Sequence, residues 1–370
     1  MNFKLSRDKA KNRLLICGAY GEGNLGDEAI LDCLLDEIYQ KTQIPVTVLT
    51  REPKKLAKRL CRYAGRDFRA VHSLDPLGII KELSQSRALI LGGGSLLQDV
   101  SSKRSLAYYI LVLKSAKSAG LSCLLYAAGI GPLSDEKTEK RAMKAVYETA
   151  VFAAARDKTS YEKLKKSGMN PDSLVLMTDP AIAVEANINY KNNIDSPYAV
   201  IALRKLKGRA KFADEIALFT DFLAEEYNLI PVFAALGPGD EKAAAEIIKK
   251  LKTKSGRIIS CADAIKTAAL IKNSEICISM RLHGLVLAAS ALAPAVGIAY
   301  DPKVSAFCED MGYPYINTEE ITAAALILAA RNEIEFGSRE KRENKLNELR
   351  LINKTATAEM FLKLERIYST

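Results

Sequence analysis

A short apolar segment, a glycine turn and a helix-period pattern follow one another repeatedly along the sequence. The first repeat has an apolar strand at residues 14–20, a Gly-Glu-Gly-Asn turn and a helical pattern over residues 25–41. Parallel strands need crossover connections, which are usually helices. The alternation therefore predicts an α/β fold in which helices cover both faces of a parallel sheet.

The alternation is interrupted once and ends in a different pattern. Residues 186–197 are polar, with four Asn and one Pro, and are typical of a linker. Apolar residues in the tail recur every three or four positions from 339 to 367, which predicts one long amphipathic helix. We therefore expect an N-terminal α/β domain over residues 1–188, a C-terminal α/β domain over 197–335, and a segment over 336–370 that packs across both.

Composition and terminal pattern predict where the protein works. The chain has seven cysteines and no CxxC pair, which favours buried, reduced thiols over a zinc site. No stretch approaches the roughly 18 uninterrupted apolar residues of a membrane-spanning helix. The apolar run at residues 14–17 is shorter than the roughly 7–15-residue apolar region of a signal peptide. We therefore expect a cytoplasmic protein that is able to act at the inner face of the membrane.

The net charge of +10 has one local concentration, in residues 51–69. Only Glu52 and Asp67 oppose its basic side chains, which are Arg51, Lys54, Lys55, Lys58, Arg59, Arg62, Arg66 and Arg69. One interpretation is a solvated helix face, and the other is a patch for anionic lipid head groups or a diphosphate. Tryptophan is absent from the chain, and aromatic residues are sparse here, which argues against nucleic acid as a partner.

The first glycine turn has the GxGxxG spacing, with Gly21, Gly23 and Gly26 between a strand and a helix. Such turns let backbone N–H groups approach an anion. A dinucleotide site also needs an acidic residue at the end of the second strand, but that strand ends at Thr50 and Arg51, which argues against NAD. Asp27 is either a helix cap or a ligand-binding residue.

The second glycine turn is GGGSLLQD at residues 92–99, directly after the apolar strand at residues 88–91. Three glycines at a strand end allow a ligand to approach the backbone, and Ser95 is suited to bind a phosphate or to cap a helix. The Lys of a P-loop is missing, which excludes an ATPase of that class.

The third motif is SMRLHGL at residues 279–285, between an apolar strand and a helical pattern over residues 285–293. Ligands of open α/β sheets bind at the carboxyl ends of the strands, and a helix N-terminus adds positive potential. Arg281 adds a positive charge, and an imidazole such as that of His283 ordinarily exchanges protons near neutral pH. We interpret the motif as an anion site. The alternative is a structural histidine.

Three more cations end predicted strands: Arg156, Arg204 and Lys303. Arginine pairs with carboxylate or phosphate through two parallel hydrogen bonds, and lysine acts as a point charge. Together these residues would suit a substrate that carries both anions, although each alone is equally consistent with a surface charge. No residue cluster suggests a metal, and we expect no cofactor.

The ordered set of motifs resembles the polysaccharide pyruvyl transferase family over most of the chain. It comprises GNLGDE from Gly23, GGGSLLQD from Gly92, GIGP from Gly129, ARD from Ala155, TDPA from Thr178 and MRLH from Met280. The segment VGIAYDPKV looks like the CsaB-type branch, which pyruvylates a secondary cell-wall polymer so that S-layer proteins can anchor. The resemblance implies a GT-B-like architecture with two Rossmann-like domains facing a cleft.

The resemblance also implies a reaction. Phosphoenolpyruvate would be a co-substrate, and the product a 4,6-linked pyruvate ketal on N-acetylmannosamine. The acceptor would be similar to a lipid-linked ManNAc-GlcNAc disaccharide on undecaprenyl diphosphate. Because a fold does not fix a function, two alternatives stay open: a GT-B glycosyltransferase that uses a nucleotide sugar, and a non-catalytic glycan-binding protein.

These expectations assign roles to named residues. His283 and Arg281 are expected to be catalytic. The donor is expected to bind mainly in the C-terminal domain, with one further arginine, Arg156, in the N-terminal domain. The donor-binding residues are Arg156, Arg204, Arg281, Leu282, His283 and Lys303. The acceptor is expected to bind, in the N-terminal domain, to Asn24, Asp27, Gly93, Gly94, Ser95 and Gln98.

Overall fold

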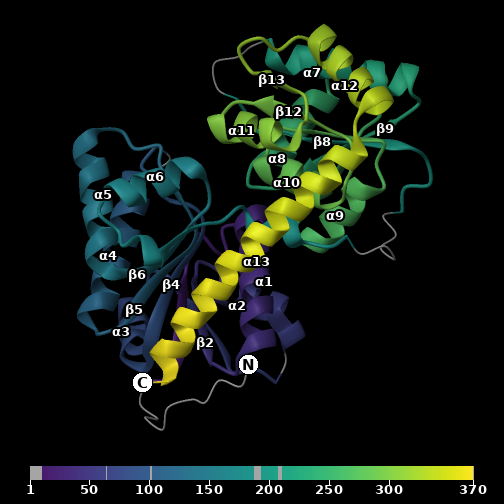
Figure 1. The fold of residues 1–370 in the computed structure, drawn as a ribbon. Coiled ribbons are helices and arrows are strands. Elements are labelled where there is room, and N and C mark those ends of the chain that lie inside the picture. The colour runs from purple at the N-terminus through teal and green to yellow at the C-terminus, as the bar shows by residue number, and fades with distance from the viewer. Residues whose placement is uncertain (1–10, 64, 101, 187–192, 207–210, 370) are drawn as a thin grey trace. The chain divides into compact units, whose positions relative to one another are not determined.

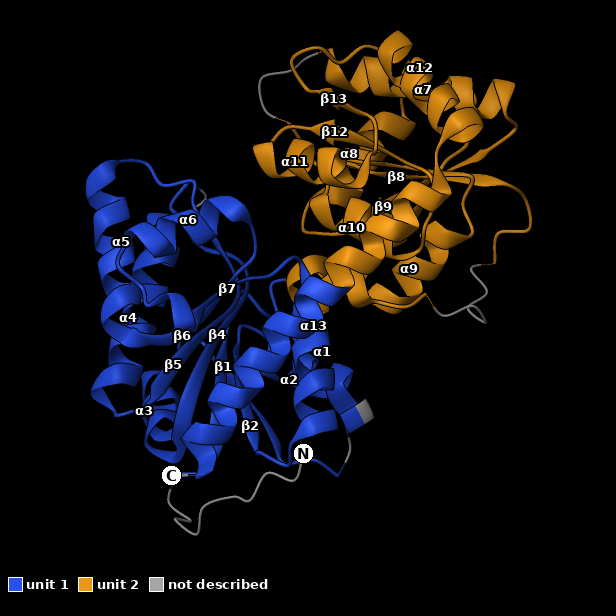
Figure 2. Ribbon diagram, in the orientation of Figure 1, with its two compact units in different colours: residues 1–22, 30–180, 351–370 blue, residues 23–29, 181–350 orange. Residues whose placement is uncertain are grey.

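The computed structural model describes residues 11–63, 65–100, 102–186, 193–206 and 211–369. Unit 1 consists of residues 1–22, 30–180 and 351–370, and unit 2 consists of residues 23–29 and 181–350 (Figure 2). Each unit holds one parallel sheet, which confirms the predicted α/β class with two Rossmann-like sheets. Residues 187–192 of the predicted linker lie outside the described residues.

Unit 1 contains a seven-stranded sheet in the order β3-β2-β1-β4-β5-β6-β7. Its strands are β1 (Arg13–Cys17), β2 (Val46–Thr50), β3 (Phe68–His72), β4 (Ser86–Leu97), β5 (Ser122–Ile130), β6 (Ala150–Ala155) and β7 (Leu174–Leu176). Both β1 and β2 are buried along their whole length, as expected for strands covered on two faces. The sheet order reverses between β1 and β4, which is the switch point of the unit.

The helices of unit 1 cover both faces of this sheet (Figure 1). The connecting helices are α1 (Leu25–Lys41), α2 (Pro53–Arg59), α3 (Pro76–Gln85), α4 (Lys103–Ser118), α5 (Glu136–Thr149) and α6 (Lys158–Lys166), with short 3-10 helices at Leu60–Tyr63, Pro171–Ser173 and Pro180–Ala183. One apolar core joins the sheet to α3, α4, α5 and α6. A second core, on the other face, joins it to α1, α2 and the C-terminal helix.

Unit 2 contains a six-stranded sheet in the order β10-β9-β8-β11-β12-β13. Its strands are β8 (Tyr198–Ala202), β9 (Ile230–Ala235), β10 (Arg257–Ser260), β11 (Ile276–Ser279), β12 (Ala295–Ala299) and β13 (Tyr315–Asn317). Its helices are α7 (Phe212–Glu226), α8 (Asp240–Ile248), α9 (Ala264–Lys272), α10 (Leu282–Ser290), α11 (Pro302–Met311) and α12 (Ala323–Phe336). The order reverses between β8 and β11.

The tail forms a single helix, α13 (Arg339–Ser369), as its apolar period predicts. The predicted stripe is buried at Leu346, Leu349, Ala356, Met360 and Leu364. Residues up to Arg350 belong to unit 2 and residues from Leu351 belong to unit 1. In unit 1 the helix ends near the amino end of β1, where the Tyr368 hydroxyl donates to the Arg13 carbonyl oxygen at 2.7 Å. Every described helix is too short or too polar to cross a lipid bilayer.

Three predicted boundaries were wrong, all at glycines. β1 ends at Cys17, before Gly18, and not at Tyr20. β4 does not end before the second glycine turn but continues through it to Leu97, with a register shift after Gly94. Gly93 and Gly94 have positive φ values of 75° and 83°, so the strand bends there instead of ending. Ser95 therefore lies inside a strand and caps no helix. The N-cap of α4 is Ser102, whose hydroxyl oxygen accepts from the Ser105 N–H.

The helix of the third motif begins at Leu282 and not at Leu285. Arg281 is its N-cap residue, and its carbonyl oxygen already accepts from the N–H of Gly284 at 2.9 Å. A glycine is needed inside this helix because a Cβ at position 284 would lie 2.3 Å from the Ser279 hydroxyl oxygen. Leu282 and His283 are thereby placed in the first helical turn.

Replacing Leu364 by Ala should destabilise unit 1 strongly, because its side chain is fully buried in the core that α13 shares with the sheet. We expect the free energy of unfolding to fall by about 2–5 kcal/mol, measured by urea denaturation followed by circular dichroism. Leu362, on the same helix but 37% exposed, is the matched control. Leu362→Ala should change the free energy by only about 0.5 kcal/mol. Equal losses in both variants would contradict the placement of α13.

Candidate functional site

The switch point of the unit 2 sheet brings together two of the predicted cations. Arg204 follows β8 by two residues, and Arg281 follows β11 by two residues. These strands are neighbours, with Ala202 paired to Ser279 at their carboxyl ends. Because the chain leaves β8 and β11 in opposite directions along the sheet, this edge is the usual ligand position of an open α/β sheet.

Arg281 is held by a buried carboxylate. Its Nε donates to Oδ2 of Asp240 at 3.0 Å, and its Nη2 pairs with Oδ1 of the same residue. The Asp240 side chain is 2% exposed and the Arg281 side chain 20% exposed. Asp240 is itself fixed, since Oδ2 also accepts from the Leu236 N–H at 3.1 Å. The pair fixes the guanidinium plane and leaves part of the group accessible.

Gly237 allows this pair to form. A Cβ at position 237 would lie 3.0 Å from Nη2 of Arg281, so the backbone of the loop after β9 packs directly on the guanidinium. The loop has the sequence Gly-Pro-Gly-Asp at residues 237–240, and Gly239 has a φ of 87°. The turn thus places Asp240 at the first position of α8, where its carboxylate binds Arg281.

His283 packs against the backbone of Gly26. A Cβ on Gly26 would lie 1.8 Å from Nδ1 and 2.0 Å from Cε1 of the imidazole, so only glycine fits there. Both residues belong to unit 2, because residues 23–29 are part of that unit. The backbone next to Gly26 is also hydrogen-bonded to the end of β9, since the Leu25 N–H donates to the Leu236 carbonyl oxygen at 2.9 Å. The first glycine turn is therefore a wall of the His283 site.

Arg204 stacks on an aromatic ring that sequence reasoning did not select. Its guanidinium carbon lies 4.7 Å from the ring centroid of Tyr300, and its Nη1 donates to the Tyr300 hydroxyl oxygen at 3.0 Å. Tyr300 follows β12, the neighbour of β11. Lys303 lies three residues further on, in the first turn of α11, whose N-cap is Asp301. Arg204, Arg281 and Lys303 thus extend from the carboxyl ends of three adjacent strands.

Unit 1 has a separate cationic centre at Arg156, which follows β6. Its Nη2 donates to the Ser95 hydroxyl oxygen at 2.9 Å, and its Nη1 lies 3.6 Å from Oδ2 of Asp179. The side chains of Arg156 and Asp179 are only 7% and 6% exposed. Gly129 on β5 makes room, since a Cβ there would lie 3.0 Å from Nη2. A predicted donor residue and a predicted acceptor residue are thus in direct contact.

The loop that carries Asp179 is fixed by the C-terminal helix. Oδ1 of Asn353, on α13, accepts from the Thr178 N–H at 2.7 Å and from the Thr178 hydroxyl at 3.0 Å. Its Nδ2 donates to the Asp179 carbonyl oxygen at 3.1 Å. Asn353 is 6% exposed, so its amide has few other partners available. Asn353 thereby fixes the backbone of Asp179, whose carboxylate lies beside Arg156.

Three of the other residues predicted for the acceptor have structural contacts. Asn24 donates from Nδ2 to Oδ2 of Asp27 at 2.6 Å, and its Oδ1 accepts from the Gly26 N–H at 3.3 Å. Asn24 thereby caps α1, and Asp27 lies in the first helical turn. Gly93 packs on Ile30, because a Cβ would lie 2.5 Å from its Cγ2. Gly94 and Gln98 lie on or directly after β4, at the same strand end as Ser95.

Sequence reasoning missed Asp240, Tyr300, Asp179 and Asn353 as site residues. Asp179 and Tyr300 had a local signal, since they lie in the TDPA and VGIAYDPKV segments. The described residues contain no group of three His, Cys, Asp or Glu side chains able to hold a metal ion.

Five of the seven cysteines are unsuited to nucleophilic chemistry. Burial raises the pKa of the Cys17, Cys123, Cys277 and Cys308 thiols to about 12 and that of Cys261 to about 11. A thiol in that range stays protonated near neutral pH.

Replacing Gly26 by Ala should move the His283 ring, since the added methyl would occupy the position of the imidazole. The backbone of Gly26 is otherwise helical, and Ala favours a helix, so the fold should persist. Imidazole 1H–15N correlation spectra can test this, because the chain has only two histidines. The signals of His283 should shift. Those of His72, an exposed residue at the end of β3 in unit 1, are the internal control and should not. Unchanged His283 signals would contradict the contact.

Comparison with solved structures shows that the fold is of the GT-B type. The S. aureus MnaA–UDP co-structure matches with a TM-score of 0.66 and 14% identity, covering 90% of this chain and 91% of that one. The UDP-GlcNAc 2-epimerase from Neisseria meningitidis bound to UDP-GlcNAc matches with a TM-score of 0.64 and 14% identity, covering 95% and 99%. The UDP-GlcNAc 2-epimerase from Methanocaldococcus jannaschii matches with a TM-score of 0.62 and 14% identity, covering 91% of this chain and 99% of that one.

Comparison at the level of sequence gives the family. A search of curated proteins finds no match. The family model of the polysaccharide pyruvyl transferases, in contrast, matches residues 24–302, a span that runs from the cap of α1 to the start of α11 and contains Arg156, Arg204, Arg281 and His283. The chain belongs to the polysaccharide pyruvyl transferase family and is a transferase enzyme.

Proposed function

We propose that this enzyme transfers the enolpyruvyl unit of phosphoenolpyruvate to a sugar and forms a cyclic pyruvate ketal with release of phosphate. The observation that carries the proposal is the group at the switch point of unit 2. There Arg281, whose guanidinium is held by Asp240, and His283, whose imidazole packs on Gly26, lie two residues apart at the start of α10. This places an anion-binding group and a proton-transfer group at one helix N-terminus.

The donor has two anionic groups, and the cations of unit 2 suit both. One edge of the Arg281 guanidinium is occupied by Asp240, and we assign its other edge to the carboxylate or phosphate of the donor. Arg204 and Lys303, at the two flanking strand ends, would bind the second anion. Arg156 is a further donor-binding candidate, in unit 1. No metal is needed in this scheme, since the arginines stabilise the departing phosphate.

The reaction needs two bond-forming steps. A proton is added to C3 of the enolpyruvyl group, and a sugar hydroxyl oxygen attacks C2 as it gains oxocarbenium character. A second hydroxyl of the same sugar then attacks C2, the bond from C2 to the phosphate oxygen breaks, and the ring closes. The two hydroxyl protons balance the reaction: one replaces the proton added to C3, and the other leaves with phosphate or solvent. We assign the proton transfer to His283.

We propose a lipid-linked cell-wall precursor that contains N-acetylmannosamine as the acceptor, in keeping with the sequence resemblance to the CsaB-type branch. The product would be the 4,6-linked ketal that serves S-layer anchoring, and the enzyme would work at the inner face of the membrane. The acceptor side is assigned to the carboxyl edge of the unit 1 sheet, at Gly93, Gly94, Ser95 and Gln98. Asn24 and Asp27, which the sequence also predicts to bind the acceptor in the N-terminal domain, belong to unit 2 instead.

A glycosyltransferase that uses a nucleotide sugar is the second candidate. It is favoured by the likeness in fold to structures that contain UDP or UDP-GlcNAc, although these are only 14% identical to the chain. Fold alone does not decide between the two. The deciding assay is phosphate release from phosphoenolpyruvate with a panel of N-acetylmannosamine acceptors, run in parallel with UDP release from UDP sugars. Release of UDP without release of phosphate would overturn the proposal.

His283→Ala should strongly slow phosphate release while phosphoenolpyruvate still binds, because the variant keeps Arg281 and its partner. General acid–base groups typically contribute about 10²–10⁴-fold, so turnover should fall by that factor. Donor binding is followed by calorimetry. His72→Ala removes the only other histidine and should leave turnover unchanged. Near-normal turnover of the His283 variant would refute the assignment.

Arg281→Lys should raise the KM for the donor, because lysine keeps the charge but cannot bind Asp240 and an anion with a rigid planar fork. The loss of one charge-assisted hydrogen bond predicts roughly a tenfold rise or more. Arg257→Lys, at an exposed position on β10, is the matched control. A donor KM that is the same in both variants would exclude Arg281 as the anion clamp.

A further inference from the structure

Tyr300 meets Arg204 across the carboxyl end of β11. Arg204 follows β8, Tyr300 follows β12, and β11 is the strand between these two in the sheet of unit 2. Strands two places apart in a sheet are separated by roughly 10 Å, so only long side chains can close the gap. The guanidinium and the phenol close it with a hydrogen bond of 3.0 Å and a stacking distance of 4.7 Å. The pair therefore lies next to the segment that connects β11 to Arg281.

The partner of Arg204 is neutral, whereas the partner of Arg281 is a carboxylate. Within the described part of the chain Arg204 forms no ion pair, and its neighbour Lys205 pairs with Glu246 instead. A phenol oxygen occupies one of the guanidinium N–H groups and removes none of the charge. Arg204 thus keeps its full positive charge, while the pair of Arg281 and Asp240 is close to neutral. An anion with more than one negative charge should therefore bind more strongly at Arg204 than at Arg281.

The hydroxyl group of Tyr300 is available as a donor. Its oxygen accepts from Nη1 of Arg204, so its proton has to go to a different acceptor. The residues that the structure describes supply no such acceptor. A hydroxyl that accepts from a cation is polarised, which makes it a stronger donor. The ring packs against the core of unit 2, so packing limits the directions in which the hydroxyl can point.

Lys303 adds a further donor near the same strand end. It lies three residues after Tyr300, in the first turn of α11. The acidic side chain between them, that of Asp301, caps this helix by accepting from the Lys303 N–H at 3.0 Å. A guanidinium, a phenol and an ammonium group on two strand ends suit the terminal oxygens of a phosphate, which point away from one another. A planar carboxylate is better matched by the fork of a single guanidinium, such as that of Arg281.

We propose that Tyr300 is a donor-binding residue and that Arg204, Tyr300 and Lys303 together bind the phosphate of the donor. The Tyr300 hydroxyl donates to a phosphate oxygen, and Arg204 supplies the charge. The edge of Arg281 that Asp240 leaves open then binds the carboxylate of the same donor molecule. The inference rests on the proposed function, and it adds to that function a binding residue and the orientation of the donor in unit 2.

The test uses two probes that each carry one of the anionic groups, inorganic phosphate and pyruvate, with the full chain. Their dissociation constants come from thermal-shift titrations at constant ionic strength, in which each variant is compared with its own midpoint without ligand. Tyr300→Phe keeps the ring but should weaken the binding of inorganic phosphate about tenfold or more, because a hydrogen bond to a charged group is lost. It should leave the binding of pyruvate unchanged. Arg281→Lys should have the opposite effect, with the larger loss for pyruvate.

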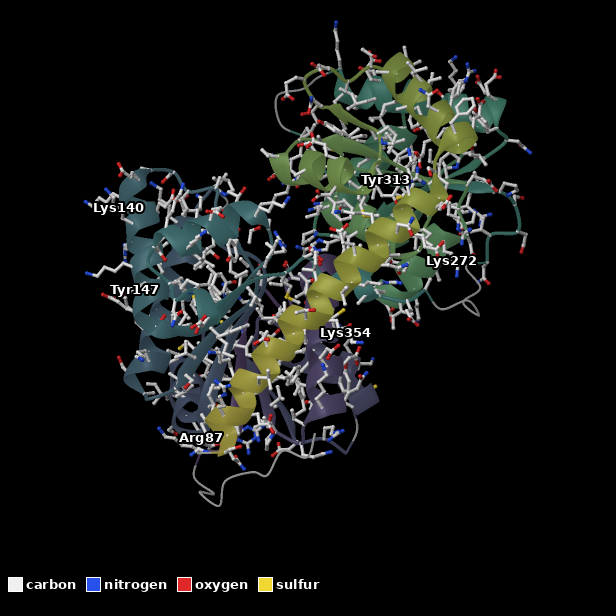
Figure 3. All side chains as sticks on the ribbon, in the orientation of Figure 1. Arg87, Lys140, Tyr147, Lys272, Tyr313 and Lys354 are labelled. Atoms are coloured by element: carbon white, nitrogen blue, oxygen red, sulfur yellow. The ribbon has the colours of Figure 1, made fainter. Side chains whose placement is uncertain are left out.

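Tyr313, which is labelled in Figure 3, provides the matched control in the same unit. Its hydroxyl donates to the Ala293 carbonyl oxygen at 3.0 Å, and these two residues precede the strands β13 and β12. They therefore lie at the amino edge of the sheet, opposite to Tyr300. Tyr313→Phe should bind both probes like the parent protein. An equal loss of phosphate binding in the two tyrosine variants, equal effects of Tyr300→Phe on both probes, or a parent protein that binds no inorganic phosphate would overturn the proposal.

A second background separates direct binding by the hydroxyl from mere support of Arg204. Tyr300→Phe is introduced into the Arg204→Met variant, and the probe is phosphoenolpyruvate, which Arg281 can still bind. If the hydroxyl contacts the phosphate, its removal should weaken binding in this background as well. If the hydroxyl only holds Arg204 in place, Tyr300→Phe should change nothing there, and that result would reject the direct contact.

The proposed function is tested separately on the same proteins, by phosphate release from phosphoenolpyruvate in the presence of an acceptor. A Tyr300→Phe variant that releases phosphate with the KM of the parent protein for the donor rejects only the phosphate-binding role of Tyr300. Binding of inorganic phosphate that depends on Tyr300, in a protein that releases no phosphate with any acceptor of the panel, rejects only the proposed function.

Discussion

In a parallel sheet all strands start at one edge, so every connection must return the chain from the carboxyl edge to the amino edge. The residues that follow the strands therefore gather along a single edge of each sheet. Where the strand order reverses, between β1 and β4 and between β8 and β11, successive connections turn away from each other and leave strand ends uncovered. Arg204 and Arg281 owe their proximity to this topology, although 77 positions separate them in the sequence.

Buried carboxylates then orient the arginines at these edges. Asp240 holds Arg281 in unit 2, and Asp179 accompanies Arg156 in unit 1. Each pair is close to neutral, so it positions a set of hydrogen-bond donors more than it supplies a net positive field. The additional positive potential in unit 2 comes from the N-terminus of α10 and from Arg204 and Lys303. Orientation and charge are thus supplied by different residues.

The sequence predicts what is local and misses what depends on tertiary packing. The strand-and-helix order, the long C-terminal helix and the cations at strand ends follow from periodicity and from the position of glycines. The predicted end of β4 was wrong because glycines in a turn and glycines in a bent strand look alike in sequence. Asp240, Tyr300 and Asn353 were missed because their partners are distant in the chain. Gly26 was read as part of an anion turn, while the structure places it against an imidazole 257 residues away.

The segment that contains Gly26 has a consequence for any attempt to dissect the protein. Unit 2 takes its first seven residues from the beginning of the chain, and unit 1 takes its last twenty from the end. A fragment covering only residues 181–350 would lose the glycine surface beneath His283, and one covering residues 1–180 would lose Asn353 and the apolar side of α13. No single cleavage point yields either half intact. The exchange of modules between relatives of this enzyme would therefore have to move two or three separate stretches together, and a simple N-terminal or C-terminal fusion of one half would not preserve its site.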